Sequence, residues 1–114
     1  MLAAAAPLGV AATAATGPLE AMPAHEALLV LALAEQVVAH CPDARIESDA
    51  ANLLASARQR RAQQLQLDAE SYERDFAAPA RQEIALPGSC QAYAAETGVL
   101  LDELRATAGP AGTP

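Results

Sequence analysis

The side chains best able to do covalent or metal chemistry in this 114-residue chain are two cysteines and two histidines. Cys41 directly follows His40, and Cys90 lies 49 positions further along the chain. A minimal, even cysteine count in a small acidic chain is typical of one structural disulfide formed in an oxidising compartment. A redox-active pair is more often a close C-x-x-C, a motif absent from this sequence. We therefore predict a disulfide between Cys41 and Cys90, which the chain-entropy description values at about 4 kcal/mol at most.

A metal site is the competing interpretation of the same residues. It would use His40, Cys41 and Cys90 as ligands, with His25 or Met22 completing the set. The two histidines lie fifteen residues apart on one expected helix, roughly 22 Å at the α-helical rise, so they cannot share an ion within one molecule. His40 is better explained as a cation at the C-terminus of that helix. We predict no metal ion and no cofactor.

Carboxylates are plentiful, but their arrangement shows no catalytic pattern. Glu70, Glu73 and Asp75 surround two aromatic residues, and Asp102 adjoins Glu103 near the end of the chain. General acid–base catalysis needs groups whose environments separate their pKa values, and no sequence feature marks these groups as buried. The sequence also lacks a G-x-S-x-G element and a phosphate-binding glycine-rich loop. We therefore expect a protein that is not an enzyme.

Composition narrows the classes of partner. The net charge is −7, from 14 acidic and 7 basic residues, and all the basic residues are arginine. Such a surface repels phosphate backbones and anionic lipids, which disfavours binding of nucleic acid or of a membrane surface. The short basic patch Arg58, Arg60 and Arg61 is better explained as a solvated face paired with acids than as an anion site. Aromatic residues make up only 3%, so the core is thin and a covalent link would help to stabilise it.

The N-terminal residues are interpreted as an Ala-rich leader over residues 1–21. Residues 1–17 carry no charge and resemble the apolar and small-residue parts of a secretory signal, although no Lys or Arg precedes them. A disordered Ala/Pro/Gly segment is the alternative. The helical domain is predicted over residues 22–106, followed by a flexible tail over 107–114. Because the leader resembles an export signal, we expect a periplasmic or secreted protein.

The domain is predicted to be all-α, a small bundle of about four helices linked by one disulfide. The first helix is expected to begin after Pro23 and to end before Cys41, because the following proline disfavours helical backbone at that residue. Its stretch from Ala27 to Ala34 is apolar on every side, yet too short to span a membrane. We expect this helix to lie at the centre of the bundle, with an interface helix covered by a partner as the alternative.

The remaining three helices are expected to begin at the cap residues Asp43, Asp68 and Ser89. The second carries a one-sided apolar stripe. Pro79 is expected to kink or end the third near Ala78, because the proline ring removes a hydrogen-bond donor and clashes with the preceding turn. Another turn or two of helix is expected to follow through Ile84. The fourth is expected to run to about Arg105.

Three segments carry a resemblance to small exported bacterial α-helical domains of unknown function that contain a single cysteine pair. They are HCPDARI at 40–46, SARQRRAQQLQLDAESYERDF at 56–76 and SCQAYAAETGVLLDELR at 89–105. In that group an apolar first helix ends in Cys, and the last helix opens with Cys. The segment between Phe76 and Cys90 is shorter in this chain. The resemblance implies a fold and an exported location, and no activity.

Three functions remain as hypotheses. The first is an exported, non-enzymatic module that binds another protein or itself through an apolar helix surface, as an accessory subunit of an envelope complex. The second is a periplasmic acid- or stress-responsive holdase chaperone, since an acidic surface neutralises as the pH falls. The third is a carrier of a small molecule or metal that uses His40 and its neighbours. No nucleic-acid partner and no integral membrane span are expected.

Overall fold

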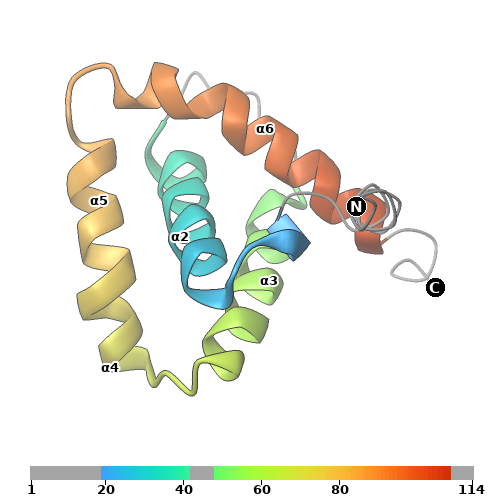
Figure 1. Ribbon diagram of the computed structural model, residues 1–114. Coiled ribbons are helices and arrows are strands. Elements are labelled where there is room, and N and C mark those ends of the chain that lie inside the picture. The colour runs from blue at the N-terminus through green and yellow to red at the C-terminus, as the bar shows by residue number, and fades with distance from the viewer. Residues whose placement is uncertain (1–18, 42–47, 109–114) are drawn as a thin grey trace, which may run out of the picture.

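The computed structural model describes residues 19–41 and 48–108, and every structural statement below concerns these residues. They form helices without strands: α2 (Ala24–His40), α3 (Ala50–Gln64), α4 (Ala69–Tyr72), the π-helical segment η1 (Glu73–Ala77), α5 (Ala78–Ile84) and α6 (Ser89–Ala108). Because α4, η1 and α5 follow one another without a break, this part of the chain makes four rods (Figure 1). The predicted all-α bundle is confirmed. The expected cap at Asp43, the leader up to residue 18 and the tail beyond 108 lie outside the described residues.

Helix α2 is the central element, with the bounds that the sequence predicted. It contacts α3, α5, η1 and α6. On one side Ala27 and Leu31 pack with α3 and α6, whereas on another side Leu28 packs against Phe76 of η1. All four of these side chains are at most 2% exposed. Helices on several sides of α2 therefore bury a segment that is apolar all round, which supplies most of the favourable free energy of folding.

A helical turn at Leu19–Ala21 precedes α2 and joins the core. Leu19 is 2% exposed and packs in the cluster formed by α2, α3 and α6. Its backbone N–H donates to Glu103 Oε2 at 2.9 Å, and its carbonyl accepts from Arg61 Nη2 at 3.5 Å. The sequence placed the start of the domain at residue 22, but these contacts attach the preceding turn to α3 and α6 as well.

Helix α3 begins later than the sequence predicted, and the residue just before it is bound by another helix. Ser48 and Asp49 form a turn, so the helix does not run through them from a start near Asp43. The Asp49 carboxylate accepts two hydrogen bonds from Arg105 of α6, at 2.8 and 3.1 Å, and makes no capping bond to α3. With its carboxylate directed to Arg105, Asp49 leaves the first backbone N–H groups of α3 without a side-chain cap.

The end of α3 turns the chain sharply toward the next rod. Gln66 has a φ of 56°, in the left-handed region where glycine is usual. The N–H of Leu67 donates to Ala62 at 2.9 Å, and the N–H of Gln66 donates to Gln63 at 3.0 Å. This pair of bonds is the Schellman arrangement. It stops α3 and leads directly into Asp68, whose carboxylate caps α4 by accepting from the Ser71 N–H at 2.8 Å, as predicted.

Pro79 does not end the third rod, which continues to Ile84. The π-helical segment η1 ends at Ala77, and Pro79 follows within the first two positions of α5. A wider turn ahead of the proline relieves the clash between its ring and the preceding turn, and the missing N–H costs less there. The rod is therefore long enough to reach from the Asp68 turn to the start of α6 (Figure 1).

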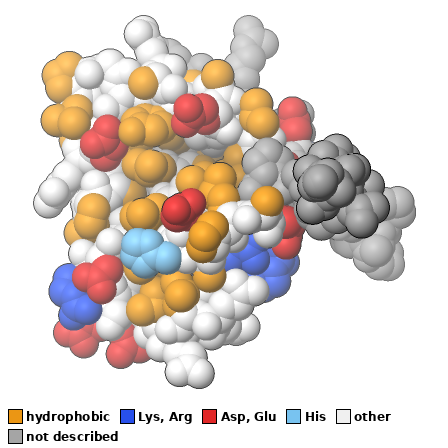
Figure 2. Space-filling model, in the orientation of Figure 1, with side chains coloured by type: hydrophobic (Ala, Val, Ile, Leu, Met, Phe, Trp, Pro, Cys, Tyr) orange, Lys and Arg blue, Asp and Glu red, His pale blue; other side chains and the backbone are white. Residues whose placement is uncertain are grey.

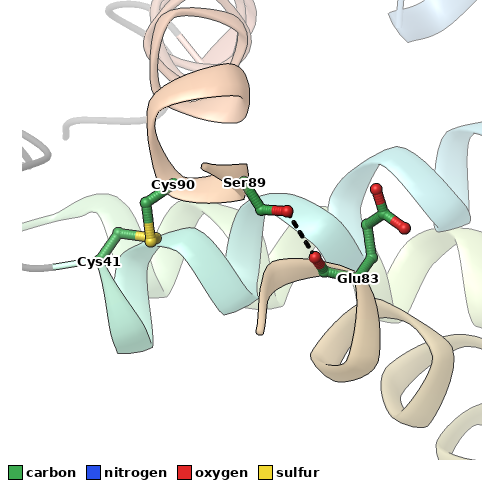
Figure 3. The surroundings of a disulfide bond; sticks show 4 residues. All are labelled: Cys41, Glu83, Ser89 and Cys90. Atoms are coloured by element: carbon green, nitrogen blue, oxygen red, sulfur yellow. Dashed lines mark hydrogen bonds between the residues drawn. A yellow bond between two sulfur atoms is a disulfide. The ribbon is translucent and has the colours of Figure 1, made fainter. Parts of the chain in front are cut away.

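The disulfide joins the C-terminus of α2 to the N-terminus of α6, as the sequence predicted. The Cα atoms of Cys41 and Cys90 lie 5.5 Å apart, and the bond closes a separation of 49 residues (Figure 3). Beside it, Ser89 Oγ donates to the Glu83 carbonyl at 2.7 Å and so ties α6 to α5. Ser89 was expected to cap α6, but Gly88 supplies the first carbonyl, which accepts from the Ala92 N–H. None of the described helices combines the length with the apolarity that a membrane span requires.

Replacing Cys41 and Cys90 together by serine should lower the free energy of unfolding by about 2–4 kcal/mol, because the open chain has more conformational freedom. Urea denaturation followed by far-UV circular dichroism measures this change. Reduced wild-type protein is the control and should unfold like the double variant. A loss below about 0.5 kcal/mol would show that the bond contributes little to this fold.

Candidate interaction surface

A partly buried polar network joins α2 to α3 and α4. Glu35 of α2 accepts from Arg58 Nε at 2.9 Å and from the Tyr72 hydroxyl at 3.2 Å. The guanidinium of Arg58 also lies over the Tyr72 ring, 5.3 Å from its centroid. The Arg58 and Glu35 side chains are 27% and 23% exposed, so the pair is better shielded from water than a surface ion pair. The network positions α3 and α4 against the central helix.

Tyr72 is the most strongly perturbed titratable group, but its environment does not suit catalysis. Burial raises the pKa of its hydroxyl, and the nearby negative charge of Glu35 raises that pKa further. The phenol therefore remains protonated over the physiological range and acts as a hydrogen-bond donor rather than a base. Its ring stacks on Phe76 with centroids 5.8 Å apart, and His25 meets Phe76 edge-on at 5.0 Å. We interpret these contacts as structural.

The arginines of α3 do not form the single solvated patch that the sequence suggested. Arg61 is only 7% exposed, and it pairs with Glu20 at 3.3 Å beneath the Leu19 turn. Its Nε has no hydrogen-bond partner. Arg58 instead pairs with Glu35, so Arg58 and Arg61 contact different parts of the protein. Burial of an arginine could not be predicted from the local sequence, because the acids that pair with both residues come from elsewhere in the chain.

The structure brings together only part of the set considered for metal binding: His40 and Cys90 line one open hollow beside the Cys41–Cys90 disulfide. Both cysteine sulfurs are used in the disulfide, so neither is available as a thiolate ligand. His25 and His40 lie in the first and last turns of α2, and His25 packs on Phe76. Within the two described ranges, no group of three or more His, Cys, Asp or Glu side chains could hold an ion.

A small apolar notch opens between α2 and α6. Its volume is about 50 Å³, and it is lined by Val30, Leu33, Ala34, Tyr93, Glu96, Thr97 and Leu100. We call this the α2–α6 notch. Ligand pockets are typically about 300–1,000 Å³, so this space suits one small apolar side chain of a partner rather than a free ligand. Figure 2 shows hydrophobic side chains gathered over the middle of this face, with acidic side chains set among them.

The notch exists because the neighbouring helices do not enclose α2. Helix α6 crosses one end of the bundle while α5 runs away along the other side (Figure 1). The sector of α2 between them includes Val30 and Leu33, which are only half-buried, whereas Leu28 and Leu31 on the other sides are fully buried. An apolar sector on the most hydrophobic helix is thus left partly in contact with water.

Glutamates surround the α2–α6 notch. Glu96 lines it and is exposed, and exposed Glu26 lies one helical turn before Val30 on the same face of α2. Glu83 of α5 accepts from the Tyr93 hydroxyl at 2.9 Å and so lies beside the notch as well. The hydrogen bond to Glu83 raises the pKa of the Tyr93 hydroxyl and keeps it protonated. The arrangement offers a small apolar socket with an acidic rim.

No protein-family model, curated protein or solved structure matches the chain. The resemblance to small exported helical domains therefore stays a prediction. The structure supports only its general part, a small helical fold with one pair of bonded cysteines.

The sequence predicted an apolar helix surface but not its location. The periodicity of α2 shows apolar residues on all sides, so it cannot indicate which side the other helices leave open. One local feature of the sequence did point to this side of α2. Glu26 lies on the same helix face as Val30 and Leu33, and a charged residue on a helix face predicts that this face lies near water. The polar network of Glu35, Arg58 and Tyr72 carried no comparable signal, since its members lie on three separate helices.

Several exposed carboxylates titrate below their usual range in the folded protein. The side-chain hydrogen bond from Arg105 lowers the pKa of Asp49, and the backbone N–H of Ser71 lowers that of Asp68. The hydrogen bond from Arg81 lowers the pKa of Glu73. A carboxyl group whose pKa is lower in the folded state contributes stability above its unfolded pKa, near 4, and loses it as the pH falls through the folded value. Acid should therefore loosen this bundle.

The melting temperature should stay nearly constant between about pH 7 and about pH 5 and fall progressively below about pH 4. Thermal unfolding followed by circular dichroism measures the profile. Asp68→Asn is the informative variant, because asparagine retains the capping group but cannot titrate. Its loss of melting temperature in acid should be smaller than that of the wild type. An identical profile would show that the Asp68 cap does not contribute to the pH dependence.

Proposed function

We propose that this chain is an exported, non-enzymatic helical module that binds another protein through the α2–α6 notch, as an accessory subunit of an envelope complex. The observation that supports the proposal is the apolar sector of the central helix at Val30 and Leu33, whose side chains are only partly buried. Covering apolar surface gains about 25 cal/mol per Å², so a partner is the natural cover for this sector. The single disulfide is compatible with an oxidising, exported location.

A holdase chaperone is the second candidate. The lowered pKa values of Asp49, Asp68 and Glu73 favour it, because their protonation removes contacts that link or cap helices. A bundle loosened in this way would expose Ala- and Leu-rich surface to unfolded clients. A carrier of a metal or small molecule would use a separate open hollow of about 520 Å³, which is lined by His40, Arg81, Gln82, Ile84, Ala85 and Cys90. This candidate is less well supported, because the two cysteine sulfurs are bonded to each other and the described residues hold no group of three or more His, Cys, Asp or Glu side chains that could bind an ion.

A photo-reactive amino acid placed at Glu96 should form a covalent adduct with one discrete protein in the envelope of the producing organism. Glu96 lines the notch and is exposed, so a probe there should not disturb the core. Gln91 is the matched control: it is exposed on the same helix, but five residues earlier and therefore on a different face. Adducts are identified by mass spectrometry. Equal labelling from both positions, or none from Glu96, would count against the notch as a binding site.

The holdase hypothesis predicts that the protein suppresses aggregation of an acid-unfolded model client at about pH 3, near or below the usual carboxylate pKa values, and not at about pH 7. Light scattering of the client measures the effect. The double Cys41→Ser/Cys90→Ser variant should act at a higher pH than the wild type, because it unfolds more readily. If client aggregation at about pH 3 is unchanged by the protein, this hypothesis is wrong.

A further inference from the structure

The shape of the α2–α6 notch restricts the kind of partner that fits it. The notch lies between two helices, and its α2 wall offers Val30 and Leu33, which are three residues apart and so lie on one helix face. A space of about 50 Å³ accepts one anchoring apolar side chain, and the half-buried residues around it extend the contact along the helices. An amphipathic helix that presents apolar residues at i, i+4 and i+7 is the common way to cover such a surface.

The charge of the rim selects among amphipathic helices. Glu96 lines the notch and is exposed, exposed Glu26 lies one helical turn before Val30 on α2, and Glu83 accepts from the Tyr93 hydroxyl. Several of the described arginines pair with acids at other places, for example Arg58 with Glu35 and Arg105 with Asp49. Basic residues that flank an apolar ridge would therefore meet carboxylates, whereas acidic residues in the same positions would be repelled.

The same charges disfavour a second copy of this chain as the occupant. The net charge is −7, so two copies repel each other before contact. A symmetric dimer through this face would also place the Glu26 and Glu96 rims of both copies close together, and like charges at an interface are costly.

We infer that the α2–α6 notch binds a basic amphipathic helix of a partner protein, with one apolar side chain inserted between α2 and α6 and Arg or Lys residues facing Glu26, Glu83 and Glu96. This inference rests on the proposed function and adds the chemistry of the partner. The inference requires the affinity to fall as the salt concentration rises. The distance over which exposed charges interact, the Debye length, shrinks from about 30 Å at 0.01 M salt to about 8 Å at 0.15 M salt.

Two synthetic helical peptides test the inference on the full, disulfide-bonded chain. Both carry leucine at the same i, i+4 and i+7 positions, and their flanking residues are all arginine in one and all glutamate in the other. Titration into isotope-labelled protein, followed by NMR, should shift the signals of Val30, Leu33 and Tyr93 with the arginine peptide. At low salt that peptide should bind at least about tenfold more tightly than the glutamate peptide, and the difference should shrink at about 0.15 M salt.

Charge reversal at the rim gives the matched control. Glu26→Lys/Glu96→Lys should abolish or invert the preference for the arginine peptide, because both residues are exposed and the fold does not depend on them. Glu70→Lys/Asp75→Lys changes the net charge equally on α4 and η1 and should leave the preference intact. If both variants lost the preference for the arginine peptide equally, net charge alone would explain that preference, and the inference would be overturned.

Three other outcomes also overturn it: equal binding of the two peptides, shifts that map away from the notch, or dimers of the chain in which the notch is covered. If no peptide binds but the probe at Glu96 still captures one protein, the proposed function stands and the basic helix is wrong. The opposite result is that the probe captures nothing but the arginine peptide still binds at the notch, and that Glu26→Lys/Glu96→Lys reverses the preference for arginine over glutamate. In that case the binding site is real, but its occupant is not an envelope protein.

Discussion

The structure depends on covering a central helix that is apolar all round. A helix with one apolar stripe needs one neighbour, but α2 has buried residues that face α3, α6, η1 and α5 in turn. Three rods cannot enclose a fourth completely when two of them diverge, as α5 and α6 do (Figure 1). The partly buried apolar sector at Val30 and Leu33 follows from that geometry. The same constraint that organises the core also leaves the α2–α6 notch.

Because the core is built mainly from alanine and leucine, specific links between helices matter more than they would in an aromatic core. The disulfide fixes one end of α6 to α2, and the Asp49–Arg105 pair ties α6 to the start of α3. Glu35 connects the middle of α2 to Arg58 and Tyr72. These links lie at different places along the helices, so each restricts a motion that the thin core would otherwise permit.

The links differ in how they respond to conditions. The disulfide is indifferent to pH and is lost only by reduction, whereas the Asp49 and Asp68 contacts weaken when their carboxylates are protonated. Glu35 is shielded more than these two surface groups and holds its partners from within the bundle. A bundle linked in this way should stay folded under oxidising conditions at neutral pH and loosen in acid. The proposed binding function and the acid-responsive alternative are both compatible with such a fold.

Features set by neighbouring residues were determined by the sequence alone. The ends of α2 at Pro23 and Cys41 and the cap at Asp68 depend on backbone chemistry within a few residues, and the pairing of Cys41 with Cys90 followed from there being only two cysteines. Competition between distant groups was decided only by the tertiary structure. Arg105 draws Asp49 away from capping, and the Leu19 turn buries Arg61.

The side of α2 that the other helices leave uncovered was also decided only by the tertiary structure. Its sequence is equally apolar on every side, so burial there depends on where the other rods lie and not on the helix itself. Pro79 shows the same principle: the local rule predicts a kink or an end, but a widened turn just before the proline keeps the rod continuous to Ile84. Local chemistry sets where a helix can begin and end, and only packing in three dimensions determines which of its faces meets water.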